Sequence, residues 1–256
     1  MRVALAGKGG SGKTTISATL SRLTARRGHP VIAVDADSNP NLATALGLEE
    51  MEADDMGDLP YALVSRRPDG PRLTAALDDV LDRHTRTAPD GVRLATMGAP
   101  GHAGAGCLCS AHATVSALLA DLAERPETVT VIDLEGTPEH LSRGTARHAD
   151  LLLLVAEPYF RSLETVRRLA GLAEELDIAR IAVVANKLRR DGDGDAIAEL
   201  AGRLGLPVVG GVPWSIDVMD ADAMHQPLLD AVPTSEVVTA IAALTDAVLT
   251  EVPTPV

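Results

Sequence analysis

Short apolar runs recur along the chain, separated by stretches in which apolar residues lie three or four positions apart. Most runs are continuous rather than alternating, which is typical of parallel strands buried on both faces. We predict strands at residues 3–6, 31–34, 92–95, 129–132, 151–155, 181–184 and 208–209. The alternation predicts an α/β fold, a doubly wound, mostly parallel sheet with helices on both faces and ligands at the carboxyl ends of its strands.

The stretches between the runs have the spacing of helices that pack one face on a core. They predict helices at 16–23, 75–84, 115–122, 163–176 and 237–249. We expect residues 1–256 to form a single domain. The segment 49–91, rich in Asp, Pro and Gly, is predicted to be an irregular surface excursion, and the last six residues a frayed tail.

Composition narrows the range of partners and compartments. There are 36 Asp and Glu against 23 Lys and Arg, and this net charge of −13 argues against nucleic acid and against stable membrane association. Aromatic residues make up only 2%, which nearly excludes base-stacking platforms. The N-terminus shows no signal-peptide pattern, and the longest apolar run, 151–156, is too short to span a bilayer. With only two cysteines as well, we expect a cytoplasmic protein.

A glycine-rich loop carries the clearest chemistry. Residues 7–14 read GKGGSGKT and match the P-loop pattern between a predicted strand and a predicted helix. Lys13 is expected to reach the β and γ phosphates, and Thr14 to bind Mg²⁺. Backbone N–H groups at the start of a helix favour an anion. The residues expected to hold the nucleotide here are Gly9, Gly10, Ser11, Gly12, Lys13, Thr14 and Thr15.

Carboxylates at two further strand ends predict the rest of a magnesium and water site. Asp35 ends one strand and Asp133 another, where each can hold Mg²⁺ directly or through water. Asp37 can orient or deprotonate the attacking water, although turn chemistry would also explain an aspartate there. Gly136 can give an amide to the γ-phosphate. Glu135 either supports the metal site or is solvated.

Lys8 makes the loop resemble a particular class of ATPases. KGGxGKT is similar to the signature of the cell-division and plasmid-partition ATPases, the nitrogenase iron protein, and the arsenite and tail-anchored-protein ATPases. The resemblance implies catalytic roles for Lys8, Lys13 and Asp37, with Lys8 reaching the nucleotide of a second subunit. It also implies that Asn186 reads the adenine edge beside Lys187, with the loop at Pro213 as the other wall. A solvated lysine and a turn asparagine are the plain alternatives.

Within this class, three stretches resemble the nickel-insertion ATPases that mature carbon monoxide dehydrogenase, the CooC type. They are GAGCLCSAHATVSALL at 104–119, LEGTPEHLSRGTARHADLLLLVAEPYFRSLETVRRL from 134, and VPWSIDVMDADAMHQPLLD from 212. A partition ATPase would need a basic DNA surface, and a division ATPase a basic C-terminal helix; neither pattern is present. The resemblance implies an ATP-dependent homodimer that serves a client metalloenzyme. The alternative is an ATP-dependent dimerisation switch for a protein partner, without a metal.

Cys107 and Cys109 offer two thiolates, and two copies facing one another would offer four. Four thiolates suit Zn²⁺ in tetrahedral geometry or Ni²⁺ in square-planar geometry, and the ligands alone do not choose between them. A buried structural pair and a redox pair are the other interpretations. His102 and His112 flank the pair and could add a ligand, but we expect both to be surface histidines.

Overall fold

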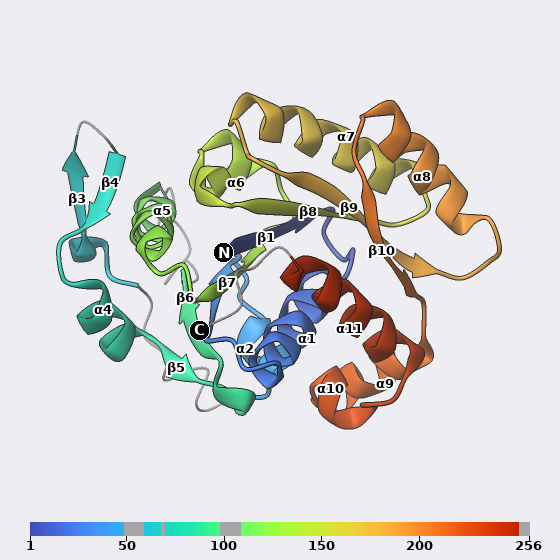
Figure 1. Ribbon diagram of the computed structural model, residues 1–256, viewed down its shortest axis with the longest axis horizontal. Coiled ribbons are helices and arrows are strands. Elements are labelled where there is room, and N and C mark those ends of the chain that lie inside the picture. Colours follow the sequence, from blue (N-terminus) through green and yellow to red (C-terminus); the bar gives the residue numbers. More distant parts are fainter. Residues whose placement is uncertain (49–58, 68–69, 98–108, 251–256) are drawn as a thin grey trace.

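An eight-stranded sheet forms the centre of the protein (Figure 1). The computed structural model describes residues 1–48, 59–67, 70–97 and 109–250. The strand order is β10-β9-β8-β1-β7-β2-β6-β5, and the strands are parallel except for β5, which runs antiparallel to β6. The strands are β1 (Arg2–Gly7), β2 (Val31–Ala36), β5 (Arg86–Thr87), β6 (Arg93–Thr96), β7 (Val129–Leu134), β8 (Leu151–Ala156), β9 (Ile181–Leu188) and β10 (Val208–Pro213).

Helices cover both faces of the sheet, as predicted (Figure 1). One face carries α1 (Lys13–Arg26), α2 (Leu42–Leu46), α9 (Ile216–Ala223), α10 (Leu228–Ala231) and α11 (Glu236–Leu249). The other carries α4 (Leu77–His84), α5 (Cys109–Asp121), α6 (Glu139–Ser142), α7 (Phe160–Glu175) and α8 (Asp193–Arg203). Within the described ranges, no helix is long and apolar enough to cross a membrane.

The central strands are buried on both sides, which explains their continuous apolar sequence. In β1, Val3 and Leu5 join one core cluster, whereas Ala4 and Ala6 join the cluster on the opposite face. Few aromatic side chains are available, so small aliphatic residues fill both cores. All seven predicted strands and all five predicted helices are present.

Two features of the fold differ from the predictions. The helix predicted to follow the cysteines begins at Cys109 itself. The described part of the 49–91 excursion is more regular than expected, because besides α4 it contains a hairpin of β3 (Val64–Arg67) and β4 (Gly70–Leu73). The hairpin lies beside α5 (Figure 1). Arg72 of β4 donates to Asp121 of α5 at 3.0 Å.

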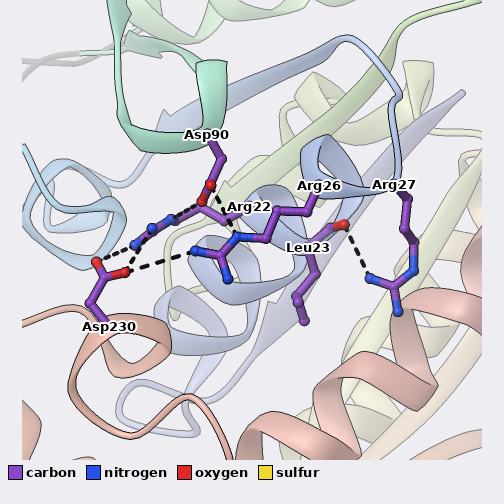
Figure 2. Close-up of polar contacts among 6 residues, drawn as sticks. All are labelled: Arg22, Leu23, Arg26, Arg27, Asp90 and Asp230. Carbon is purple, nitrogen blue, oxygen red and sulfur yellow. Dashed lines mark hydrogen bonds and ion pairs between the residues drawn. The ribbon is translucent and has the colours of Figure 1, made fainter.

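A buried arginine ties α1 to two segments that are distant in the sequence. Figure 2 shows Arg22 between Asp90, which follows β5, and Asp230 on α10. Its Nε donates to Asp90 at 2.6 Å and its two terminal nitrogens donate to Asp230 at 2.5 and 2.8 Å. Burial alone would raise the pKa of Asp90, but hydrogen bonds from Arg26 and Arg22 hold it below its ordinary value.

Replacing Arg22 with Met should lower the free energy of unfolding by about 2–4 kcal/mol, because it leaves two carboxylates without their buried partner. Arg26→Gln is the matched control: Arg26 also donates to Asp90, at 3.0 Å, but its side chain is 42% exposed. Exposed ion pairs contribute little, so this variant should lose less than about 1 kcal/mol. Urea unfolding measures both, and equal losses would contradict a special role for Arg22.

Candidate nucleotide-binding site

The glycine-rich loop lies between β1 and the start of α1, in the context that the sequence predicts. Gly10 and Gly12 have φ angles of 78° and 92°, a left-handed conformation that glycine adopts without strain. The Ser11 N–H donates to the Lys8 carbonyl at 3.0 Å, which curls the loop over the first turn of α1. The N–H groups of that turn therefore line a ready site for an anion.

Lys13 is buried against this loop, with 6% of its surface exposed. Its Nζ donates to the Lys8 carbonyl at 3.3 Å. Burial lowers the pKa of Lys13, and the negative charges of Asp133, Asp37 and Glu135 oppose that shift. An ammonium held in this setting gains from any anion that enters the loop, which fits a phosphate chain.

Asp133 stands at the carboxyl end of β7, directly against the start of α1. Its two oxygens accept hydrogen bonds from the Thr14 hydroxyl at 2.6 Å and from the Ser17 hydroxyl at 3.2 Å. Burial raises the pKa of Asp133 to about 6, and the Thr14 hydrogen bond opposes that shift. Ser17 was not predicted, yet it lies one turn beyond Thr14 on the same helix, so helical spacing could have found it.

Asp35 lies beside Asp133, because the two residues are register partners on neighbouring strands. Its oxygens accept the N–H groups of Asp37 at 3.1 Å and Leu42 at 2.8 Å, so it anchors the loop from 37 to 41. Burial and the charge of Asp133 raise the pKa of Asp35 to about 7. Two buried carboxylates and the Thr14 hydroxyl form a hard oxygen donor set, which fits Mg²⁺.

Asp37 and Glu135 lie at the rim of this site, and both are half-buried. The Asp37 carboxylate accepts the Asn39 N–H at 2.8 Å, which is the turn chemistry given above as the alternative explanation. Burial and the charge of Asp37 raise the pKa of Glu135, and a hydrogen bond from Ser38 opposes the rise. A role of Asp37 toward the attacking water stays a prediction.

Gly136 brings the segment 135–144, which we call switch II, onto the glycine-rich loop. A Cβ atom at Gly136 would lie 2.6 Å from the Gly9 nitrogen and 2.7 Å from its Cα. These atoms are backbone and have no flexible side chain that could move away. Glycine is therefore required at 136 for the two segments to approach as closely as they do.

Asn186 and Lys187, at the end of β9, support the loop from the other side. The Asn186 Nδ2 donates to the Ser11 carbonyl at 2.6 Å, so one amide hydrogen is used by the loop itself. The Lys187 Nζ donates to the Gly10 carbonyl at 2.5 Å and pairs with Glu157 at 3.3 Å. The adenine-reading role of Asn186 stays a prediction, and Glu157 is a contact that no sequence motif indicated.

Pro213 ends β10 and is followed by the single tryptophan of the chain. The Trp214 N–H donates to the Leu188 carbonyl at 2.9 Å, which holds this loop beside the end of β9. The Arg189 guanidinium stacks over the Trp214 ring at 4.3 Å from the centroid. This pair is a flat surface next to Lys187, in the place where the sequence predicts a wall of the base pocket.

The predicted metal-binding cysteines are only partly within the described residues. Cys107 and His102 lie outside them, and Cys109 is the first residue of α5. The structure thus places the second cysteine of the motif at the start of the helix that packs between the β3–β4 hairpin and the segment Thr145–His148. Neither nickel nor zinc binding follows from this placement alone.

His112 is buried, with 3% of its surface exposed, so the expectation of a surface histidine was wrong. It lies one turn after Cys109, on the face of α5 that packs against switch II and the segment after it. Its Nδ1 lies 3.2 Å from the Thr145 hydroxyl, and its ring centroid is 4.4 Å from that of His140. Burial lowers the pKa of both histidines, that of His140 to about 3.

A parallel sheet, a phosphate loop at its central strand and two carboxylates beside that loop define a P-loop nucleotide hydrolase. The model of the CobQ/CobB/MinD/ParA nucleotide binding domain matches residues 3–228. The chain therefore belongs to this family, and it is an ATPase, as the sequence predicts.

Relatives support the same assignment. The carbon monoxide dehydrogenase accessory protein CooC of Rhodospirillum rubrum is 35% identical over 232 residues, covering 87% of each chain. An uncharacterised ATP-binding protein of Methanocaldococcus jannaschii is 34% identical over 235 residues, covering 89% of this chain and 91% of its own. The MinD cell-division protein of Aquifex aeolicus has the same fold, with a TM-score of 0.73 at 19% identity over 100% of this chain and 99% of its own.

Gly136→Ala should lower ATP turnover at least about tenfold, because the new methyl group would push switch II away from the loop. Gly171→Ala is the control: a Cβ there, on α7, meets nothing within 4 Å. That variant should keep wild-type turnover and gain about 0.5–1 kcal/mol of stability. Phosphate release measures turnover, and normal turnover in Gly136→Ala would show that the contact is not needed.

The paired carboxylates should make the stability of the metal-free protein depend on pH. Their pKa values, about 7 for Asp35 and about 6 for Asp133, exceed the unfolded value of about 4. Folding therefore binds protons, and these groups lower the free energy of unfolding as pH rises from about 4 to about 7. Asp133→Asn removes one ionisation, and the Thr14 and Ser17 hydroxyls can reorient to pair with the amide.

In EDTA, Asp133→Asn should thus gain stability relative to the wild type as pH increases, with the difference levelling off above about pH 7. Urea unfolding at several pH values measures this. Asp220→Asn, on the exposed face of α9, is a control that should not change with pH in this way. A difference between Asp133→Asn and wild type that is constant from pH 5 to pH 8 would contradict the prediction.

Proposed function

We propose that this protein is a Mg-ATP-dependent, homodimeric metallochaperone ATPase. It would hold nickel or zinc between the Cys107–Cys109 segments of two subunits and assist metal insertion into a client enzyme such as carbon monoxide dehydrogenase. The observation that carries the proposal is the packing of α5, which begins at Cys109, against switch II through His112 and His140. The name of the CooC relative supports the client class.

In this proposal the nucleotide site works through residues that already face one another. Lys13 and the loop N–H groups bind the β and γ phosphates, and Thr14, Asp133 and Asp35 hold Mg²⁺. The ion would neutralise charge that develops on the phosphoryl oxygens. Asp37 orients a water that attacks the γ-phosphorus and takes up its proton, while the bond to the β–γ bridging oxygen breaks and yields ADP and inorganic phosphate.

A continuous set of contacts leads from the phosphate loop to the cysteine helix. Gly136 touches Gly9 of the loop. Four residues later, His140 of α6 contacts His112 of α5. A change at the γ-phosphate that moves switch II would therefore move the helix that begins at Cys109. This arrangement supports a metal site whose two halves approach in the ATP state and separate after hydrolysis.

Residues at the edge of the nucleotide site also support the proposal that the partner is a second copy of this chain. Phe160, the first residue of α7, is 81% exposed, and Tyr159 is 40% exposed. Both follow β8, whose Val155 is the register partner of Gly7 at the start of the loop. The Lys8 ammonium lies 6.0 Å from the Tyr159 ring. An apolar surface beside a reachable lysine fits a subunit that covers the nucleotide, with Lys8 contacting its phosphates.

A dimerisation switch without a metal is the second candidate. The fold similarity to MinD favours it, because the same ATP-dependent dimer could position a protein partner. The two candidates share the phosphate loop and the dimer. They differ only in whether the cysteine segments bind a metal.

Metal titration in the presence of a non-hydrolysable ATP analogue separates the candidates. We expect one Ni²⁺ or Zn²⁺ per dimer with the analogue, because four thiolates are then together, and much weaker binding without it. The Cys107→Ser, Cys109→Ser double variant should lose this stoichiometry. Ser110→Ala, a neighbouring change on α5, should retain it. Elemental analysis and light scattering measure the metal content and the mass.

Lys8→Ala tests whether the dimer assembles the metal site. If Lys8 contacts the nucleotide of the second subunit, this variant should stay monomeric with the analogue and bind less than half of the wild-type metal. Full metal binding by the double cysteine variant would refute the metallochaperone and leave the dimerisation switch. If the Lys8→Ala protein dimerises normally, this result would refute the dimer that both candidates share, in which Lys8 contacts the nucleotide of the second subunit.

A further inference from the structure

A cavity lies beside α5, on the face of the helix that carries His112. It has a volume of about 440 Å³ and is bounded by α5, by β4 of the hairpin and by residues 143–148, which begin at the end of switch II. Its charged and titratable lining residues are all basic: Arg72, Arg143, Arg147, His112 and His148. No acidic side chain lines it in the part of the chain that the structure describes. In a chain with a net charge of −13, this is an unusual concentration of guanidinium groups.

Two of the three arginines are held in position from outside the cavity. Arg72 pairs with Asp121 at 3.0 Å, and Arg143 pairs with Glu139 at 3.1 Å. Neither carboxylate belongs to the cavity lining. These pairs fix the two guanidinium groups at the cavity wall.

Arg147 differs from the other two arginines of the cavity. It is exposed, and its Nε lies 3.2 Å from the position that a Cβ on Gly144 would occupy. The structure shows no carboxylate paired with it among the described residues. The Cζ and Nη2 atoms of Arg147 lie 3.4 Å from the same Cβ position, so the guanidinium occupies space that a side chain at residue 144 would need.

The two histidines respond to the positive charge around them. Burial lowers the pKa of His148, and the charges of Arg2, Arg147 and Arg72 lower it further. Burial and the charge of Arg143 lower the pKa of His112 in the same way. The charge of Glu139 opposes the shift at His112 and that of Asp121 opposes the shift at His148, but the side chains that line the cavity are basic and would complement an anionic ligand.

We propose that this cavity binds a ligand bearing two or more carboxylates, either a free polycarboxylate or the acidic side chains of a protein partner. Arginine recognises carboxylates through paired N–H donors. The rest of the lining is mixed: Pro71, Ala113 and Ala120 are apolar and suit a short carbon skeleton, and Ser116 and Thr145 add hydroxyl groups. The ligand would touch both α5 and the segment after switch II. The proposal does not depend on metal binding at Cys107 and Cys109.

Calorimetric titration with two probes tests this site. The probes are citrate and a peptide containing four consecutive glutamates, each at constant ionic strength. Saturating Mg-ADP is present throughout, because the phosphate loop would itself bind anions. Arg147→Gln should weaken binding of the active probe roughly tenfold, the usual effect of losing a charge-assisted pair of hydrogen bonds.

Arg203→Gln removes the same charge from an exposed position on α8, where Arg203 pairs with Glu199 at 3.4 Å. It should leave binding unchanged within about twofold, whereas Arg147→Lys, which keeps the charge but not the fork of donors, should fall between wild type and Arg147→Gln. Circular dichroism melting verifies that each variant is folded.

The results with the two probes, citrate and the glutamate peptide, identify the source of the carboxylates. If Arg147→Gln weakens the binding of citrate, the result would support a free polycarboxylate as the ligand. If Arg147→Gln weakens the binding of the peptide, the result would support an acidic partner protein. Binding of neither probe below about 10 mM would overturn the proposal, as would equal affinity in the wild type and Arg147→Gln.

Discussion

The arrangement of the nucleotide site depends on two carboxylates that lie side by side in the interior of the protein. Asp35 and Asp133 are register partners on neighbouring strands, and both are almost fully buried. Their repulsion is relieved by donors on three sides: hydroxyls of α1, the backbone of the loop after β2, and the nearby Lys13 ammonium. Each donor belongs to a segment that borders the predicted nucleotide site, so the same pair fixes the start of α1 and the loop after β2 beside the glycine-rich loop.

Charge is distributed unevenly over a molecule that is acidic overall. Positive side chains gather at the phosphate loop, where Lys8, Lys13 and Lys187 surround the anion position, and again at the cavity beside α5. Acidic groups cover much of the remainder. Such local fields select anionic ligands at defined places while the net charge disfavours nonspecific contact with nucleic acid. His112 of α5 lines this cavity and also contacts His140 of switch II, so one helix connects the two basic regions.

The sequence patterns were sufficient to predict the sheet, because strands buried on both faces carry uninterrupted apolar runs. They were also sufficient to predict the phosphate loop, because phosphate binding requires glycine and lysine at fixed spacing. They were insufficient where a residue's role depends on a neighbour that is distant in the chain. His112 is buried where α5 packs against His140 and Thr145, and the apolar spacing of α5 did not show those contacts. The β3–β4 hairpin was missed because its strands are charged, although Pro68, Asp69 and Gly70 form a turn sequence.

The position of β1 in the sheet has a consequence for how the chain acquires its site during synthesis. Among the described strands β1 comes first in the chain, yet it pairs with β7 and β8, whose register partners lie between residues 130 and 155. Until those strands have left the ribosome, the glycine-rich loop has no sheet to hold it and Lys13 has no Asp133 nearby. We therefore expect the nucleotide site to form only after β8 has been synthesised, so that ATP stabilises a sheet that has already assembled rather than acting as an early template.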